Sequence, residues 1–203
     1  MAEFCGASVE VEGVHNLPRR PHAAVVAANH MSALETLVLT SMLIPFTDHT
    51  FVVKESLLHY PGFGPLIREI RSIPVRRARA REDLAVMMEA GVQRLTSGIS
   101  VVVFPQSTRR PVFDPRDFNS IAVKLAGRAG VPIVPLALRT DFQEEGRIAK
   151  DFGRLHPERP LRFEFGPPVR VEGTGRDAQA RVIGFIEERL RRWGVPVAGP
   201  LSA

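Results

Sequence analysis

Apolar residues occur along the chain in short runs that do not alternate with polar residues. Such runs, rich in Val, Ile and Ala, are typical of strands that are buried on both faces of a parallel sheet. Six runs have the length of a strand: residues 23–28, 51–53, 73–75, 99–104, 133–138 and 161–165. The pattern therefore predicts a sheet in which most strands are parallel.

In the segments between and after these runs, apolar residues recur every three or four positions, which is the spacing of one face of a helix. This spacing predicts a helix over residues 81–96, a second one that Asn119 can cap and that ends at Gly130, and a third over about 177–193. Each is followed by a glycine that can end a helix, namely Gly98, Gly130 and Gly194. Strands that alternate with helices indicate an α/β fold with helices flanking a mostly parallel central sheet. We expect residues 1–203 to form a single domain.

Length and composition agree with one globular domain. The 203 residues are 44% hydrophobic and 24% charged, which excludes disorder and fibrous repeats. Three of the 27 basic residues are Lys, which leaves 24 Arg, and the net charge is +5. Arg binds phosphate through two parallel hydrogen bonds, so this excess suggests an anionic partner. A biased genomic composition would give the same excess.

The chain carries one cysteine, Cys5, which excludes an internal disulfide and makes a cytosol-facing location the default. No run reaches the roughly 18–20 apolar residues that a membrane span needs, and the N-terminus lacks the basic-then-apolar order of a signal peptide. The six histidines show no spacing typical of metal ligands, so we expect no metal site.

The first candidate site directly follows the run at 23–28, where residues 29–35 read NHMSALE. Catalytic groups of α/β folds often lie at the carboxyl ends of strands. On one helix His30 and Glu35 would point about 140° apart, so their pairing requires His30 to precede the helix. Ser32 as the N-cap would give that geometry. The same residues also form a capping box, in which Glu35 only satisfies an amide of the first turn. The two roles are compatible.

The second candidate site, FPQSTRR over residues 104–110, follows another predicted strand. Its two arginines, Arg109 and Arg110, have the planar fork that suits phosphate. Taken alone, a polar loop of this kind is more often plain surface than a site. Its interpretation therefore depends on the motifs that accompany it.

Together these segments resemble the 1-acylglycerol-3-phosphate acyltransferase family, also called lysophosphatidic acid acyltransferases, within the glycerolipid acyltransferases. The family's signatures run in a fixed order: N-H-x-S-x-x-D, a K-x-x-L…P-x-x-G block ending in Arg, F-P-E-G-T-R, and a V-P-I-V-P-V-like strand. The chain shows NHMSALE at 29–35, KESL at 54–57, PGFG at 61–64, IPVRR at 73–77, FPQSTR at 104–109 and VPIVPL at 131–136. Four signatures in order are far more specific than any one of them. The resemblance covers a motif-bearing core of about residues 23–140.

The resemblance implies an O-acyltransferase of phospholipid synthesis. It would move a fatty acyl group from a thioester, either acyl-CoA or acyl carrier protein, to the hydroxyl of a lysophospholipid, 1-acylglycerol 3-phosphate. The chain offers no convincing covalent nucleophile, because Cys5 lies outside every motif and no G-x-S-x-G elbow occurs. The acceptor hydroxyl would then attack the thioester directly, with His30 as general base and Glu35 bracing the imidazole. No cofactor is expected besides the acyl thioester co-substrate.

The residues expected to bind substrate lie in the second motif and in the block between the two motifs: Arg109, Thr108, Ser107, Gln106, Lys54 and Arg77. Arg109 would hold the phosphate of the acceptor with its fork, assisted by the other hydroxyl and basic groups. Backbone amides around Ser107 are the candidates for binding the oxyanion.

Two departures from the family pattern bear on this assignment. Glu35 replaces the family's Asp, which keeps the charge and adds one methylene. Gln106 and Ser107 stand where the family has Glu and Gly, so a negative charge is lost and a β-carbon is gained. The alternative is therefore a catalytically weakened homologue that binds lipid phosphate. The intact pair of His30 and Glu35 argues against that alternative.

An apolar group followed by arginines suggests peripheral contact with the cytoplasmic face of a membrane. The apolar members are Leu57, Leu58, Tyr60, Phe63, Leu66 and Ile67, and the basic ones are Arg68, Arg71, Arg76, Arg77, Arg79 and Arg81. The apolar residues could equally belong to the core or line an acyl-chain groove. No nucleic-acid partner is expected, because the sequence shows neither a cluster of stacking aromatics nor a recognisable binding motif.

Overall fold

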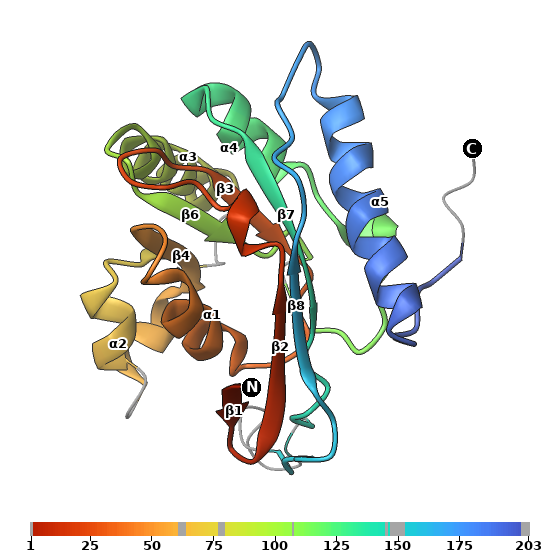
Figure 1. Ribbon diagram of the computed structural model, residues 1–203. Helices are drawn as coiled ribbons and strands as arrows, with labels where there is room; N and C mark the ends of the chain where they lie inside the picture. Colours follow the sequence, from red (N-terminus) through yellow and green to blue (C-terminus); the bar gives the residue numbers. More distant parts are fainter. Residues whose placement is uncertain are drawn as a thin grey trace.

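The molecule is built around one mixed β-sheet (Figure 1). The computed structural model describes residues 2–60, 64–76, 80–106, 108–144, 146 and 153–199. Its strands within these ranges are β1 (Ala2–Phe4), β2 (Ala7–Glu12), β3 (Val25–Ala28), β4 (His49–Lys54), β5 (Ile73–Val75), β6 (Ser100–Val103), β7 (Ile133–Arg139) and β8 (Leu161–Phe165). They lie side by side in the order β1-β2-β8-β7-β3-β6-β4-β5.

Helices connect the strands. The α-helices are α1 (Glu35–Leu43), α2 (Gly64–Glu69), α3 (Ala80–Thr96), α4 (Ile121–Ala129) and α5 (Arg176–Arg192). Short 3-10 helices lie at Val14–Asn16, Glu55–His59 and Pro115–Asp117. The three helices that apolar periodicity predicted are α3, α4 and α5, and their bounds agree with the prediction within a few residues.

Five neighbouring strands form the parallel part of the sheet, because β7, β3, β6, β4 and β5 all run in one direction. Strand β8 is antiparallel to β7, and β2 pairs in parallel with β8. All six predicted strands are present, so the expectation of a mostly parallel sheet flanked by helices is confirmed. The parallel strands place their carboxyl ends at one common edge of the sheet.

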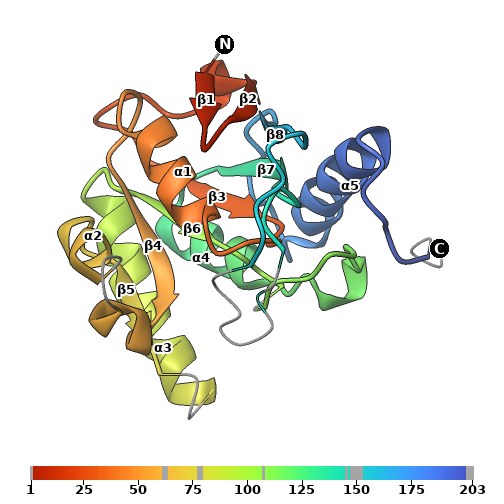
Figure 2. The same ribbon diagram turned by 90° about the horizontal axis from the view of Figure 1, so that it is seen from below.

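The sheet separates two layers of core. Alternate residues of β3 face opposite sides, with Val25 and Ala27 in one apolar cluster and Val26 and Ala28 in the other. Helices α3, α4 and α5 contribute to the first cluster, and α1 and α2 contribute to the second. In Figures 1 and 2, α1 and α5 accordingly lie on opposite sides of the sheet.

Strands β1 and β2 were not predicted from the apolar pattern. Most of β2 is half-buried or exposed, and Ala7 is its buried residue, so the strand carries no continuous apolar run. Its backbone instead pairs with β8 from Val9 to Glu12 and with β1. Pairing of this kind depends on a partner about 150 residues away in the sequence, which local patterns do not reveal.

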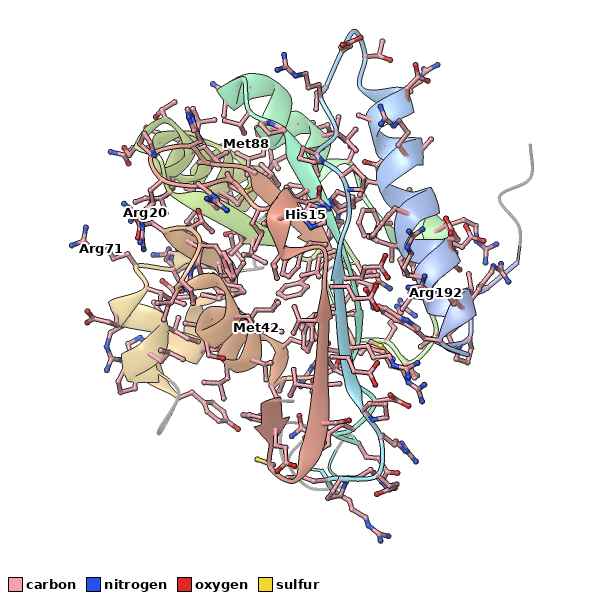
Figure 3. All side chains as sticks on the ribbon, viewed as in Figure 1. His15, Arg20, Met42, Arg71, Met88 and Arg192 are labelled. Carbon is pink, nitrogen blue, oxygen red and sulfur yellow. The ribbon has the colours of Figure 1, made fainter. Side chains whose placement is uncertain are left out.

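The apolar residues that follow β4 differ in burial, and some lie in the core while others are partly exposed. Ile67 is fully buried in the second cluster, and Leu57 and Leu58 are half-buried against the same cluster. Arg71, close to the end of α2, projects outward at the rim (Figure 3). Phe63, Arg77 and Arg79 lie outside the described residues. None of the described helices has both the length and the apolar run that crossing a bilayer requires.

Two of the predicted helix-ending glycines give a matched test of backbone strain. Gly98 and Gly130 both have left-handed backbones, with φ of +80° and +69°. A β-carbon at Gly98 would lie 2.5 Å from the carbonyl oxygen of Pro21, whereas one at Gly130 meets nothing within 4 Å. We expect Gly130→Ala to lower the free energy of unfolding by about 1–2 kcal/mol, the cost of the left-handed backbone alone. Gly98→Ala should cost more, because backbone must also move. Urea denaturation of both variants measures the difference, and equal losses would refute the steric argument.

Candidate active site

The chemistry-bearing residues gather where the parallel strands end. Strand β3 lies between β6 and β7, and Ala27 is in register with Val103 and Pro135. Residues that follow these three strands are therefore neighbours in space. They are residues 29–35 after β3, the described residues of the 104–110 motif after β6, and Thr140 after β7.

Asn29 fixes the end of β3. Its side-chain amide donates to the carbonyl of Leu138 at 2.8 Å, and its side-chain oxygen accepts from the Leu138 amide at 2.9 Å. The side chain thus extends the pairing with β7 by one rung beyond the last strand residue, in a position that is 1% exposed. His30 comes next in the sequence and is held at the edge of the sheet.

His30 and Glu35 form a close pair. The Nδ1 atom of His30 lies 2.5 Å from Oε2 of Glu35, whose side chain is fully buried, while the imidazole is 19% exposed. An ionised carboxylate only accepts, so a neutral imidazole bonded to it would carry its hydrogen on Nδ1 and leave the lone pair of Nε2 free. This is the tautomer that a general base requires. The predicted pairing of the two residues is confirmed.

The start of helix α1 differs from the prediction. The helix begins at Glu35 with Leu34 as its N-cap, and no side chain caps it, so the prediction of Ser32 as N-cap is wrong. The Oε1 atom of Glu35 nevertheless accepts from the amides of Met31 and Ser32, both at 2.7 Å. A bend at Ala33 and a turn at Leu34 separate these two amides from the helix, so the Glu35 side chain reaches back along the chain to accept from them. Glu35 thus serves the helix start and His30 together.

The second motif packs directly on His30. The ring of Phe104 stacks on the imidazole with centroids 4.3 Å apart and planes 21° apart. The side-chain oxygen of Gln106 accepts from the His30 amide at 3.0 Å, and the amide of Arg110 donates to the His30 carbonyl at 2.9 Å. The loop after β6 is therefore part of the same site and not a detached surface loop.

The structure describes four of the six residues predicted to bind substrate: Gln106, Thr108, Arg109 and Lys54. The first three belong to the loop that contacts His30. Gln106 is buried, Arg109 is half-buried and Thr108 is exposed. Lys54 is the exposed last residue of β4, at the same edge of the sheet. Ser107 and Arg77 lie outside the described residues. The binding roles of all six stay predictions.

Ion pairs hold the continuation of this loop. Arg110 is 3.2 Å from Asp117, and Arg116 forms several hydrogen bonds with Asp114. The bonds from the side chain and the backbone of Arg116 lower the pKa of Asp114 to about 2. Asp114 is thus charged at neutral pH. It also caps the short helix at 115–117 by accepting from the Arg116 amide.

Sequence reasoning missed one member of the site. Thr140 is 1% exposed and donates its hydroxyl hydrogen to Oε1 of Glu35 at 2.5 Å. No motif marks Thr140 in the sequence, because it comes close to Glu35 only through the pairing of β3 with β7. Across the described ranges, no three His, Cys, Asp or Glu side chains converge in the way that a metal ion needs.

Comparison with known proteins gives consistent results. Residues 8–139 match the family model described as Acyltransferase. The chain is 28% identical over 188 residues to a 1-acyl-sn-glycerol-3-phosphate acyltransferase of Pseudomonas aeruginosa, which covers 93% of this chain and 68% of the relative. It is 31% identical to the human 1-acyl-sn-glycerol-3-phosphate acyltransferase alpha, covering 85% of this chain and 58% of that protein. The chain thus spans about three fifths of the human relative.

The fold also has a counterpart among solved structures. The crystal structure of the 1-acyl-sn-glycerophosphate (LPA) acyltransferase PlsC from Thermotoga maritima superposes with a TM-score of 0.68 at 22% sequence identity. The match covers 95% of this chain and 75% of that one. At this level of identity the likeness concerns the arrangement of helices and strands.

Removal of the Asn29 amide tests how far the site depends on the β3–β7 junction. Asn29→Ala leaves a buried amide and a buried carbonyl of Leu138 without partners, so we expect a loss of about 2–4 kcal/mol in unfolding free energy. Asn16→Ala is the matched control, because the Asn16 side chain gives a single hydrogen bond, to the Phe165 carbonyl at 2.9 Å. Urea denaturation compares the two. A smaller loss for Asn29→Ala than for Asn16→Ala would contradict this account.

Proposed function

The chain belongs to the acyltransferase family that its motifs resemble, and on this premise we propose that it acylates a lysophospholipid. The acyl group would come from a thioester, acyl-CoA or acyl carrier protein, and the acceptor would be 1-acylglycerol 3-phosphate. One observation carries the proposal: the imidazole of His30, braced by a buried carboxylate, is in contact with the loop that holds Arg109. The names of the relatives supply the acceptor.

Acyl transfer to a hydroxyl needs a base that removes the hydroxyl proton as the carbon–oxygen bond forms. Nε2 of His30 has the free lone pair for this step, and the ring is partly exposed while Glu35 is not. The acceptor oxygen attacks the thioester carbonyl, the proton passes to Nε2, and the tetrahedral intermediate expels the thiolate. The imidazolium then returns its proton to the thiolate, and Glu35 stabilises the positive charge in the meantime.

The phosphate of the acceptor is assigned to Arg109, with Thr108 and Lys54 as further donors. The position of Arg109 close to His30 supports this assignment. The amide of Arg110, the next residue, donates to the backbone carbonyl of His30, so Arg109 is attached within one residue of the base. A phosphate gripped there would place a hydroxyl of the same glycerol unit near His30. The exposed arginines beside α2 would face an anionic membrane surface at the cytoplasmic face.

A catalytically weakened homologue that only binds lipid phosphate is the alternative. The described geometry gives it little support, because Gln106 keeps a hydrogen bond to the His30 amide and the His30–Glu35 contact is closed. Thiol release from acyl-CoA and acyl carrier protein, with lysolipids of different headgroups and with glycerol 3-phosphate, separates the two. Binding of lysophosphatidic acid without thiol release from any donor would favour the alternative.

Replacement of the base should stop turnover while the fold persists. We expect His30→Ala to lower kcat by about 10² to 10⁴, the usual contribution of a general base. His15→Ala is the matched control, because His15 lies at the opposite, amino edge of the parallel strands beside Ala24 and Pro132 (Figure 3). Thiol release and circular dichroism are measured on both variants. Wild-type turnover in folded His30→Ala protein would exclude His30 as the base.

Loss of the proposed phosphate ligand should affect binding of the acceptor more than the chemical step. Arg109→Ala removes a charged donor, so we expect the acceptor KM to rise about 10- to 100-fold, as for one or two hydrogen bonds to a charged group. Arg128→Ala serves as the control, since Arg128 is exposed in the last turn of α4, near the amino end of β7. Initial rates at varied lysolipid concentration give both constants. An unchanged KM in Arg109→Ala would mean that the phosphate binds elsewhere.

A further inference from the structure

The carboxylate of Glu35 is held by more than the residues of its own motif. Its Oε1 atom accepts three hydrogen bonds, from the amides of Met31 and Ser32 and from the hydroxyl of Thr140. Its Oε2 atom accepts from Nδ1 of His30. The first oxygen is thus fully engaged, and the second is left to the imidazole.

Thr140 differs from the other donors in where it comes from. The two amides belong to the turn that also carries His30, so they move with the pair they support. Thr140 directly follows β7, a strand that is buried for most of its length, and it is 105 residues away from Glu35 in the sequence. Its hydroxyl is therefore the donor that fixes the carboxylate relative to the β-sheet.

The longer side chain of Glu35 makes such a contact useful. The family pattern has Asp at this position, and Glu adds one rotatable bond that must be ordered before the carboxylate can meet the imidazole. The last torsion of a Glu side chain has broad minima, so packing alone defines it poorly. A hydroxyl that bonds one oxygen fixes this torsion and with it the direction of the other oxygen.

We propose that Thr140 is a positioning residue of the active site, which orients the Glu35 carboxylate so that Oε2 holds His30 in the tautomer with hydrogen on Nδ1. The proposal rests on the proposed function for its effect on turnover, and on geometry alone for its effect on the imidazole. In this role the Thr140 hydroxyl acts through Glu35 and neither binds the substrate nor takes part in proton transfer.

Two substitutions separate the hydroxyl from the shape of the side chain. Thr140→Val keeps the volume and removes the donor, and we expect kcat to fall about 10- to 100-fold, the factor for one hydrogen bond to a charged group. The acceptor KM should not change, because Thr140 acts on the base alone. Thr140→Ser keeps the donor and should retain most of the activity. Equal losses in the two variants would mean that the methyl group matters, and would overturn the proposal.

Thr47→Val is the matched control for removing a buried hydroxyl. Thr47 is fully buried, and its hydroxyl is 3.0 Å from Ser100 Oγ at the amino ends of β4 and β6, the edge opposite the site. We expect this variant to lose stability and to keep wild-type kcat. A fall in kcat as large as that of Thr140→Val would show that the loss reflects general destabilisation, and would count against a positioning role.

A double-mutant cycle with Glu35→Gln asks whether Thr140 acts through the carboxylate. Gln offers a neutral acceptor that cannot hold the imidazolium in the same way. Thr140→Val should therefore cost much less in the Glu35→Gln background than in the wild type. The same loss in both backgrounds would overturn the proposal, because Thr140 would then act by another route.

The tautomer of His30 can be read without turnover. Nitrogen-15 chemical shifts of the His30 ring, assigned by comparison with His30→Ala, should show hydrogen on Nδ1 in the wild type and in Thr140→Ser. In Thr140→Val the fraction of the other tautomer should rise. If the wild type transfers no acyl group, the proposed function fails while this measurement still decides the role of Thr140. Identical nitrogen-15 chemical shifts of the His30 ring in the wild type, Thr140→Ser and Thr140→Val would refute the positioning role of Thr140.

Discussion

The structure depends on one buried carboxylate and on the donors that surround it. Glu35 is fully buried, and burial of a carboxylate costs several kcal/mol unless hydrogen bonds replace the lost water. Its four donors come from the turn after β3 and from the residue after β7. These donors meet at one point only when β3 and β7 are paired in register. The side chain of Asn29, bonded on both sides to Leu138, secures that pairing at the last rung.

Local patterns predicted those parts of the fold whose burial is visible in the sequence itself. The parallel strands are continuous apolar runs because both of their faces are covered, and α3, α4 and α5 show the spacing of one buried face. Strands β1 and β2 were not predicted because backbone pairing defines them, and the pairing of β2 is with β8, a distant segment of the sequence. The N-cap of α1 was misplaced because residues 32–35 have the pattern of a capping box, whereas the helix begins only at Glu35.

The site was predictable to the extent that its residues form motifs. The spacing of His30 and Glu35 allowed their pairing if His30 preceded the helix, and the resemblance implied that pairing and assigned the second motif to substrate binding. Thr140 could not be found in this way, because a threonine after a strand carries no signal until the register of β3 and β7 is known. Its role arises from the three-dimensional arrangement and not from any short stretch of sequence.

The exchange of Glu for Gln at position 106 has a specific meaning in this arrangement. The contact that Gln106 makes with the site is acceptance of a hydrogen bond from the His30 amide, and the side-chain oxygen of either residue can do this. The other terminal atom of the Gln106 side chain is a nitrogen, where Glu would have a second oxygen. The Nε2 atom of Gln106 is buried and has no hydrogen-bond partner among the described residues. The chain has thus kept the contact that positions His30 while removing a negative charge from the loop that precedes Arg109.

That loss of charge matters for the proposed reaction, in which the site binds an anion and forms a cation. During the proposed transfer the imidazole becomes positively charged next to the loop that carries Arg109 and Arg110, and positive charges in its surroundings oppose this change. A phosphate held by Arg109 offsets the arginine charge, and the carboxylate of Glu35 offsets the imidazolium directly. Since Gln106 contributes no charge, Glu35 is the negative side chain in contact with His30 among the residues described. The carboxylate of Glu35 must therefore be oriented accurately toward the imidazole, and the hydrogen bond from Thr140 anchors this carboxylate to the sheet for that purpose.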